Sequence, residues 1–304
     1  MNIFKFINKG NYYISVNKKF KFYLLRLYRK KRKELFMNCT HNTIYRFLTI
    51  NSYFINIKSY INLCKQLGFN EKKYFSEIIK YKTKMSFPVN IKQLKINKPF
   101  LRVLGHILGD GGIHINEKEK KYRVFYVNNQ EVLLNSFEKD IYEIFGKLKI
   151  YKRNRLLHGD EIWLPNSVGL ILYSILNYKD NNNDKRIPKF IFKIKDKKLL
   201  GVFIQSIFDD DGFLYPTKNM IVISQKRIKL LSEIRKVISL IGIKPNKILI
   251  HNSKNRTVMR YFTITSKLNI KKFNKYIGFN HPEKKQKLKI LIKKYGGMLL
   301  CAVL

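Results

Sequence analysis

One pattern occurs twice in the chain and constrains its fold more than any other feature. A short apolar helix ending in aspartate and glycine appears as VLGHILGDGG around Asp110 and as IQSIFDDDGF around Asp211. In each copy the apolar residues recur at helical spacing, and Asp-Gly marks the end of the helix. Two such helices packed side by side would bring Asp110 and Asp211 together at one end of their interface. The repeat therefore predicts a shared divalent-metal site.

Small residues in the first copy favour close packing of the two helices. Gly105 and Gly109 stand four residues apart, so they lie on one face of a helix and let a second backbone approach. The second copy offers Ser206 and, less suitably, Asp210. A single helix ending in Asp-Gly is usually structural, and it is the matched second copy that favours a functional pair.

The charge of the chain indicates the class of its partner. Lys and Arg number 62 against 20 Asp and Glu, which gives a formal net charge of +42 over 304 residues. Part of the lysine content fits an AT-rich coding sequence, but such a bias would not suppress acidic residues. The apolar runs are short and interrupted by charge, so none reaches the roughly 18 residues that span a bilayer. The predicted partner is a nucleic acid and not a membrane, with affinity that falls steeply as salt rises.

The cysteines and the N-terminal segment bear on the compartment. Cys39, Cys64 and Cys301 stand far apart, which argues against a disulfide framework or a zinc site. Lysines interrupt the first apolar segment, so no secretory signal is indicated. We expect an intracellular protein, in the cytoplasm of a prokaryote or in an organelle such as a mitochondrion or chloroplast. The basic, aromatic run at 20–32 is compatible with a nucleic-acid arm, an import signal or a solvated helix.

Residues 1–95 form a first, mainly helical region, bounded by Pro88 and Pro99. Helices are predicted at 57–67 and 71–81 with a glycine turn between them. Such a pair is typical both of helix-turn-helix DNA-binding domains and of ordinary helical packing.

From residue 96 the chain predicts one order of elements twice, α-β-β-α-β-β-α. The predicted halves are 96–195 and 196–297, followed by a tail at 298–304. In the first half we predict strands at 122–127, 148–152 and 161–164 and helices at 132–145 and 167–176; in the second, strands at 220–224, 248–251 and 258–265, a helix at 226–241 and helices to 295.

These motifs and halves resemble the monomeric, two-motif LAGLIDADG homing endonucleases over residues 96–297. Three further segments share the resemblance: IPKFIF before the second motif helix, ISQKRIKLLSEI from 223 and GFNHPEKKQKL from 278. The resemblance implies a pseudo-twofold α+β fold in which the motif helices form the interface between halves. It also implies that two four-stranded antiparallel sheets form a saddle over the DNA major groove. The implied activity is site-specific cleavage of double-stranded DNA to short 3′ overhangs.

The resemblance also implies roles for individual residues. Asp110 and Asp211 would hold Mg²⁺, for which Mn²⁺ can substitute, with the carbonyls of Gly109 and Asp210 as further ligands. Lys284 would lie near the attacking water, with Lys185 or Lys189 as its first-half counterpart, and Gln130 would orient that water. Asp209 is expected to cap or orient the second motif, and His106 to pack in the first motif helix. The predicted DNA-contacting residues are Lys121, Arg123, Tyr126, Lys152, Arg153, Arg155, Arg256 and Arg260.

Two alternatives remain open from the sequence: a maturase that binds intron RNA with the same fold, and a DNA-binding regulator that does not cleave. Retention of both Asp110 and Asp211 argues against the regulator, because binding alone does not need paired carboxylates in so cationic a protein. It does not argue against the maturase.

Overall fold

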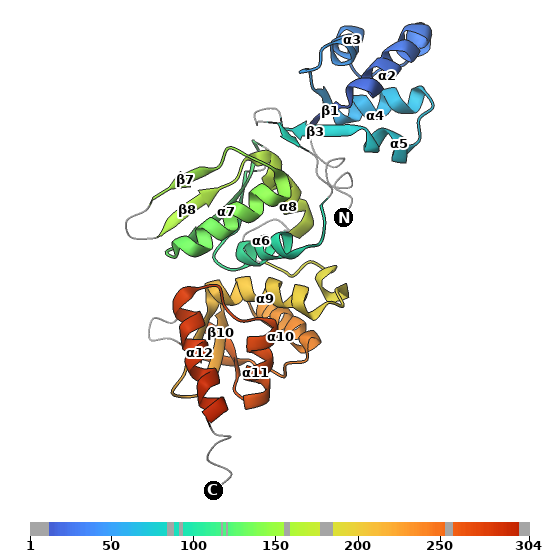
Figure 1. The fold of residues 1–304 in the computed structure, drawn as a ribbon. Coiled ribbons are helices and arrows are strands. Elements are labelled where there is room, and N and C mark those ends of the chain that lie inside the picture. Colours follow the sequence, from blue (N-terminus) through green and yellow to red (C-terminus); the bar gives the residue numbers. More distant parts are fainter. Residues whose placement is uncertain are drawn as a thin grey trace.

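The computed structural model describes residues 12–83, 88–90, 94–116, 118–119, 121–154, 159–176, 185–252 and 258–297. Figure 1 shows an N-terminal unit, a first half and a second half, arranged in sequence order. No helix in the described ranges is long and apolar enough to cross a membrane.

The N-terminal unit combines helices with a small sheet. Most of its regular structure is helical, as predicted, but the sheet was not predicted. Its antiparallel sheet has the order β2-β1-β3-β4. Its elements are β1 (Tyr13–Val16), α2 (Lys18–Lys31), η1 (Arg32–Glu34), α3 (His41–Thr49), β2 (Ile55–Asn56), α4 (Ile57–Gln66), α5 (Glu71–Ser76), β3 (Ile78–Lys82) and β4 (Val89–Asn90).

The second helix of the predicted pair is shorter than expected. It ends at Ser76, and the following residues form β3, which pairs antiparallel with β1 along the middle of the sheet. Tyr81 of this strand is completely buried. A nonlocal partner strand therefore overrides the local helical pattern at 78–81.

The basic run at 20–32 lies in α2. Asn17 caps this helix by accepting a hydrogen bond from the backbone N–H of Lys19 at 2.9 Å. Phe20, Leu24 and Tyr28 face inward, whereas most of the basic residues lie on the exposed side.

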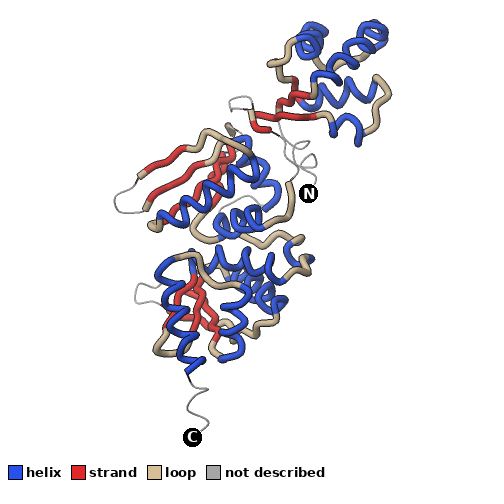
Figure 2. Tube along the Cα trace, in the orientation of Figure 1, coloured by secondary structure: helices blue, strands red, loops and turns tan. Residues whose placement is uncertain are grey.

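Each half contains the predicted α-β-β-α-β-β-α order, and a strand follows each motif helix within a few residues. Figure 2 shows the helices and strands of both halves. The sheet orders are β5-β6-β8-β7 and β11-β12-β10-β9, both antiparallel, which confirms the predicted fold class. The strand predicted at 148–152 begins only at Tyr151. The first half contains α6 (Lys98–Leu108), β5 (Gly112–Asn116), β6 (Lys121–Asn128), α7 (Glu131–Phe145), β7 (Tyr151–Arg153), β8 (Asp160–Trp163) and α8 (Asn166–Leu176). The short helix η2 (Ile191–Lys193) precedes the second half, which contains α9 (Lys197–Asp211), β9 (Gly212–Tyr215), β10 (Met220–Gln225), α10 (Ile228–Ile241), β11 (Leu249–Asn252), β12 (Val258–Ile264), α11 (Lys267–Tyr276) and α12 (Pro282–Gly297).

The motif helices α6 and α9 pack against each other between the two halves (Figure 1). A Cβ atom added at Gly105 would lie 2.6 Å from the carbonyl oxygen of Phe203 and 2.7 Å from the Cβ of Ser206. Both separations are too short for a side chain, so the close approach of the two backbones depends on glycine here. This confirms the packing role predicted for Gly105 and Ser206.

The N-terminal unit contacts the first half at α8. Asn166 donates from Nδ2 to the hydroxyl of Thr83 at 3.3 Å, and the buried Tyr12 hydroxyl lies 3.5 Å from the carbonyl oxygen of Ser167.

Candidate active site

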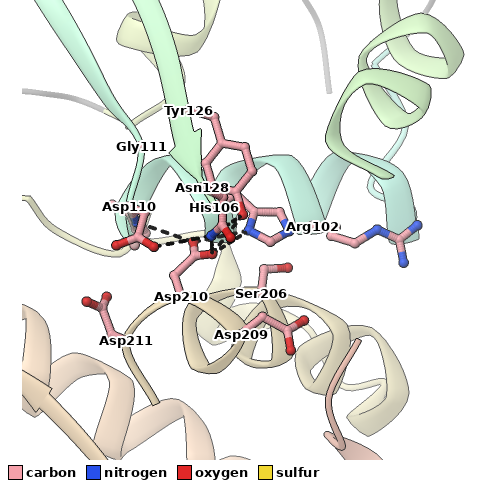
Figure 3. Close-up of polar contacts among 12 residues, drawn as sticks. Arg102, His106, Asp110, Gly111, Tyr126, Asn128, Ser206, Asp209, Asp210 and Asp211 are labelled. Atoms are coloured by element: carbon pink, nitrogen blue, oxygen red, sulfur yellow. Dashed lines mark hydrogen bonds and ion pairs between the residues drawn. The ribbon is translucent and has the colours of Figure 1, made fainter. Parts of the chain in front are cut away.

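The two motif aspartates lie at the same end of the α6–α9 pair (Figure 3). Helix α6 ends at Leu108, and its cap Gly109 leads directly to Asp110. Helix α9 continues through Asp211 before its own cap at Gly212. The side chains of Asp110 and Asp211 thus approach each other from opposite halves, which is the arrangement predicted from the repeat.

Each aspartate receives one side-chain amide hydrogen bond from its own half. Nδ2 of Asn128, at the end of β6, donates to Oδ2 of Asp110 at 3.3 Å. Nε2 of Gln225, at the end of β10, donates to Oδ2 of Asp211.

The strand registers show that these two amides are structural equivalents. Two residues after each motif aspartate, Gly112 pairs with Phe125 and Phe213 pairs with Val222. Phe125 and Val222 are therefore equivalent, and the residues three positions later are Asn128 and Gln225. Neither amide was predicted from the sequence, because the equivalence of the two halves at these positions depends on how the strands pair.

Two lysines cap the C-terminal ends of the motif helices in the same way, by donating to backbone carbonyls. Nζ of Lys185 donates to the carbonyls of Leu108, Gly109 and Gly111 at 3.1, 2.8 and 2.6 Å. Nζ of Lys284 donates to the carbonyls of Phe208, Asp209 and Asp210. Both ammonium groups satisfy backbone acceptors and face the negative ends of helix dipoles.

This geometry selects between the two predicted counterparts of Lys284. Lys185 is the structural equivalent, whereas Lys189 is exposed on the surface. The carbonyl oxygens of Gly109 and Asp210, predicted as metal ligands, accept hydrogen bonds from these lysines. A carbonyl oxygen has a second lone pair, so this contact leaves each with capacity for another partner.

The carboxylates disfavour each other's charge. Burial, followed by the nearby Asp110 and Asp210, raises the pKa of Asp211 to about 8. Burial and then Asp210 raise the pKa of Asp110 to about 6, a smaller shift because this residue also meets solvent. Burial lowers the pKa of Lys185 to about 8 and also lowers that of Lys284. The site thus concentrates acidic oxygens whose charge a bound cation would stabilise.

Two cavities flank the aspartates. The first, of about 390 Å³, lies beside Asp110 and is lined by residues from both halves, including Asn128, Gln130, His281 and Lys284. The second, of about 470 Å³, lies beside Asp211 and is lined by Ser224, Gln225, Lys226, Arg227 and Met259. Each cavity is therefore lined by one motif aspartate together with the amide that donates to it, Asn128 in the first and Gln225 in the second.

The structure places Gln130 in the first cavity, next to Asp110. Its backbone N–H donates to Oδ1 of Asn128 at 2.9 Å, which helps to fix that amide. The predicted role of the Gln130 side chain, orientation of a water molecule, stays a prediction.

Asp209 holds a turn of the second half, and its predicted role in capping or orienting the second site stays a prediction. Its carboxylate accepts the backbone N–H groups of Asn280 at 2.9 Å and His281 at 3.0 Å, directly before α12 begins. It thereby fixes the turn that leads to Lys284.

Asp210 fills the space above Gly109. A Cβ added at Gly109 would lie 2.7 Å from the Cβ of Asp210, so glycine makes room for the larger residue across the interface. The carboxylate of Asp210 contacts Nδ1 of His106 at 3.1 Å and accepts from the hydroxyl of Tyr126 at 2.8 Å. The sequence left in doubt whether an acid could pack at this position, and these contacts show how it does.

Nδ1 of His106 and Oδ2 of Asp210 lie close enough for an ion pair, but burial opposes the charge on both side chains. Burial lowers the pKa of His106 to about 4 and raises the pKa of Asp210 to about 8. The contact is therefore a hydrogen bond between groups whose charged forms are disfavoured. His106 is completely buried and packs on Tyr126 at a ring-centroid distance of 4.6 Å, which agrees with its predicted packing role.

One predicted DNA contact is wrong. Tyr126 is completely buried, because side chains alternate along β6 and its neighbour Val124 on the same face is also buried. Arg123 and Lys121 are exposed on the opposite face of this strand.

The other predicted DNA contacts are accessible or lie outside the described residues. Lys152 and Arg153 are exposed on β7, although Lys152 also pairs with Glu138 at 2.5 Å. Arg260 donates to the carbonyl of Lys226 at 2.7 Å, near the second cavity. Arg155 and Arg256 lie outside the described residues.

A family model described as a LAGLIDADG-like domain matches residues 199–278. The chain carries a LAGLIDADG-like domain. The match begins in α9 and ends after α11, and the first half repeats the same order of elements around its own motif helix. The resemblance predicted from the two motifs is therefore confirmed.

Two curated proteins match a large part of the chain at low identity. The chain is 24% identical over 242 residues to glutamine–fructose-6-phosphate aminotransferase [isomerizing] of Methanocaldococcus jannaschii, covering 78% of this chain and 21% of that protein. It is 25% identical over 300 residues to a DNA polymerase of Thermococcus sp. (strain GE8), covering 86% of this chain and 17% of that protein. The chain spans only about a fifth of these relatives, and their named activities differ from each other.

Solved structures of similar fold include two homing endonucleases. I-DmoI in complex with DNA and Mn has 20% sequence identity and a TM-score of 0.46, covering 60% of this chain and 97% of that chain. I-WcaI bound to its DNA recognition sequence has 17% identity and a TM-score of 0.39, covering 65% of this chain and 88% of that chain.

Proposed function

We propose that this protein is a site-specific endonuclease that hydrolyses double-stranded DNA with a divalent metal. The observation that carries the proposal is the pairing of Asp110 and Asp211 between two cavities, each lined by the amide that donates to its motif aspartate. A duplicated set of acidic groups suits two phosphodiester bonds, one on each strand of a duplex. The net charge of +42 supplies the attraction for a polyanion.

The residues at the site fit a divalent metal. Mg²⁺ takes oxygen ligands, and it is commonly held by one or two carboxylates together with substrate phosphates. The described residues include no group of three His, Cys, Asp or Glu that could hold a metal, so the fit rests on Asp110 and Asp211 with phosphate oxygens. A bound Mg²⁺ would supply Lewis-acid activation of water and charge stabilisation at the leaving oxygen. Mn²⁺ is expected to substitute, because it too accepts oxygen ligands.

The remaining groups of the site orient the motif carboxylates and water, and they neutralise negative charge. Asn128 and Gln225 hold the two motif carboxylates through their amides. Lys185 and Lys284 hold positive charge beside the positions where phosphate would enter, which favours the developing negative charge of the reaction. Gln130 lines the first cavity, and we assign to its amide the orientation of a water molecule.

Specific recognition is assigned to the face of each sheet that points away from the helices. Arg123 and Lys121 on β6 and Arg153 on β7 are exposed cations, and we propose that they contact the DNA. Phosphate contacts of this kind set affinity, and contacts to base edges set specificity.

The test compares the wild-type protein with an Asp110→Asn, Asp211→Asn double variant. Both are incubated with a plasmid library of randomised and host-flanking DNA, with Mg²⁺ at low salt. Discrete double-strand cuts by the wild type alone would support the proposal, and an Asp160→Asn variant, which changes an exposed acid of β8, should cut normally. Binding to DNA or intron RNA without cleavage, or equal cleavage by the double variant, would contradict it. An RNA maturase would retain intron-dependent activity in the double variant.

A further inference from the structure

The two halves hold their motif aspartates differently. Around Asp110 lies a buried polar cluster formed by His106 and Tyr126 of the first half and Asp210 of the second (Figure 3). The side chains of His106 and Asp210 are completely buried, and Tyr126 is a completely buried residue. We call these three residues the polar clamp.

The second half has no such cluster at the equivalent positions. Counting back from each aspartate, the equivalents of His106 and Asp210 are Ile207 and Gly109. The sheet registers make Ile223 the equivalent of Tyr126. Every polar member of the clamp is thus replaced by an apolar or small residue beside Asp211.

The clamp contacts Asp110 by two routes. The backbone N–H of Asp110 donates to Oδ2 of Asp210 at 3.3 Å, which ties its main chain to the opposite half. Nδ2 of Asn128 lies 3.2 Å from the Tyr126 hydroxyl and 3.3 Å from Oδ2 of Asp110, which ties its carboxylate to the same network. Asp211 also accepts a side-chain amide hydrogen bond, from Gln225, but this donor belongs to its own half.

Buried hydrogen bonds of this kind restrict position, because breaking one leaves polar atoms without partners. Nε2 of His106 already lacks a partner within the described structure, so Nδ1 carries the only hydrogen-bonding contact of this ring. That one-sided arrangement directs the imidazole toward Asp210. The clamp therefore favours a single position of the α6 end relative to α9.

We propose that Asp210 is a positioning residue for Asp110. Because the polar clamp surrounds only this motif aspartate, cleavage of one DNA strand depends on Asp210 more strongly than cleavage of the other. The inference rests on the proposed endonuclease function. Asp210 acts through the backbone of Asp110 across the interface, so its removal displaces one motif acid and leaves the Asp211–Gln225 contact in place. A small displacement in an active site is enough to slow its reaction strongly.

The experiment measures the cleavage rate of each DNA strand separately. A duplex with the recognised site carries a different dye on each strand, and single-turnover cleavage is followed with Mg²⁺. Asp210→Ala should slow one strand at least about tenfold and the other by no more than about twofold, so nicked DNA accumulates. Tyr126→Phe, which removes only the hydroxyl, should slow the same strand by a smaller factor. Gln225→Ala should slow the opposite strand, which identifies the half that serves each one.

Ser206→Ala is the matched control for loosening of the helix interface. Ser206 is buried on α9, and its hydroxyl donates to the carbonyl of Val202 in the same helix at 3.1 Å. A general loss of packing should slow both strands alike. If Asp210→Ala slows both strands equally, or neither, the positioning role is wrong.

Hydrogen exchange separates this inference from the proposed function. The amide of Asp110 should exchange about tenfold faster in Asp210→Ala than in the wild type or Ser206→Ala, because its acceptor has been removed. This can be measured without DNA or metal on a peptide that contains Asp110. If the wild-type protein cuts no DNA but this amide changes, the proposed function fails and the positioning role stands. An unchanged amide overturns the positioning role whatever the cleavage result.

Discussion

Replacing Asp211 with asparagine should stabilise the metal-free protein, although it removes one of the two motif acids. Burial and the neighbouring acids raise the pKa of Asp211 from 3.8 to about 8. A carboxyl group whose pKa is raised on folding binds more protons in the folded state, so stability is lost as the pH rises from about 4 to about 8. Asparagine has nearly the same shape, carries no charge, and keeps an oxygen that can accept from Gln225.

The magnitude follows from the pKa shift. About 4 pKa units at roughly 1.4 kcal/mol each set an upper limit near 6 kcal/mol. Asp211 lines an open cavity in which water and ions screen its charge, so we expect about a third of this limit, roughly 2 kcal/mol at pH 8. For a chain of this size such a gain raises the Tm by roughly 3–6 °C.

The assay is thermal unfolding of wild type and Asp211→Asn between pH 4 and pH 8, with and without Mg²⁺. The gain should be largest at pH 8 and shrink toward pH 4. Mg²⁺ should stabilise the wild type by about 2–3 kcal/mol at roughly 100 times its Kd, and should stabilise the variant much less. The exposed Asp160→Asn variant serves as the control. A variant less stable than the wild type at pH 8 without metal, or a gain independent of pH, would refute the reasoning.

Three further outcomes are expected. Gly105→Val should lower the free energy of unfolding by about 1–3 kcal/mol, because its side chain would overlap Phe203 and Ser206; unchanged denaturant midpoints would contradict this. Lys284→Met should slow cleavage at least about tenfold with little change in DNA affinity, since its contacts lie at the aspartates; a loss of affinity alone would assign the lysine to binding. Arg153→Ala should weaken DNA binding and reduce the slope of log K against log salt by about 1; an unchanged slope in a binding titration would remove Arg153 from the phosphate contacts.

The sequence alone determined the duplicated halves, the motif helices and the pairing of Asp110 with Asp211. These features depend on apolar spacing and on helix ends, which are local properties of the chain. Two equivalent helices that each bury an apolar face have few other ways to pack, so their acids meet at one end. The excess of positive charge is likewise a property of composition, and it predicted a nucleic-acid partner without any coordinates.

Tertiary structure decided which side chains meet across elements that are distant in sequence. The strand at 78–82 formed because β1 and β4 pair with it, which local helical pattern does not show. The direction of Tyr126 depended on the pleat of β6, and a shift of one residue in that alternation exchanges a core contact for a DNA contact. Asp210 looked like a departure from the motif until Gly109, His106 and Tyr126 were placed around it. A buried polar side chain is tolerated only where hydrogen-bonding partners converge on it, and that convergence is set by the packing of the two halves.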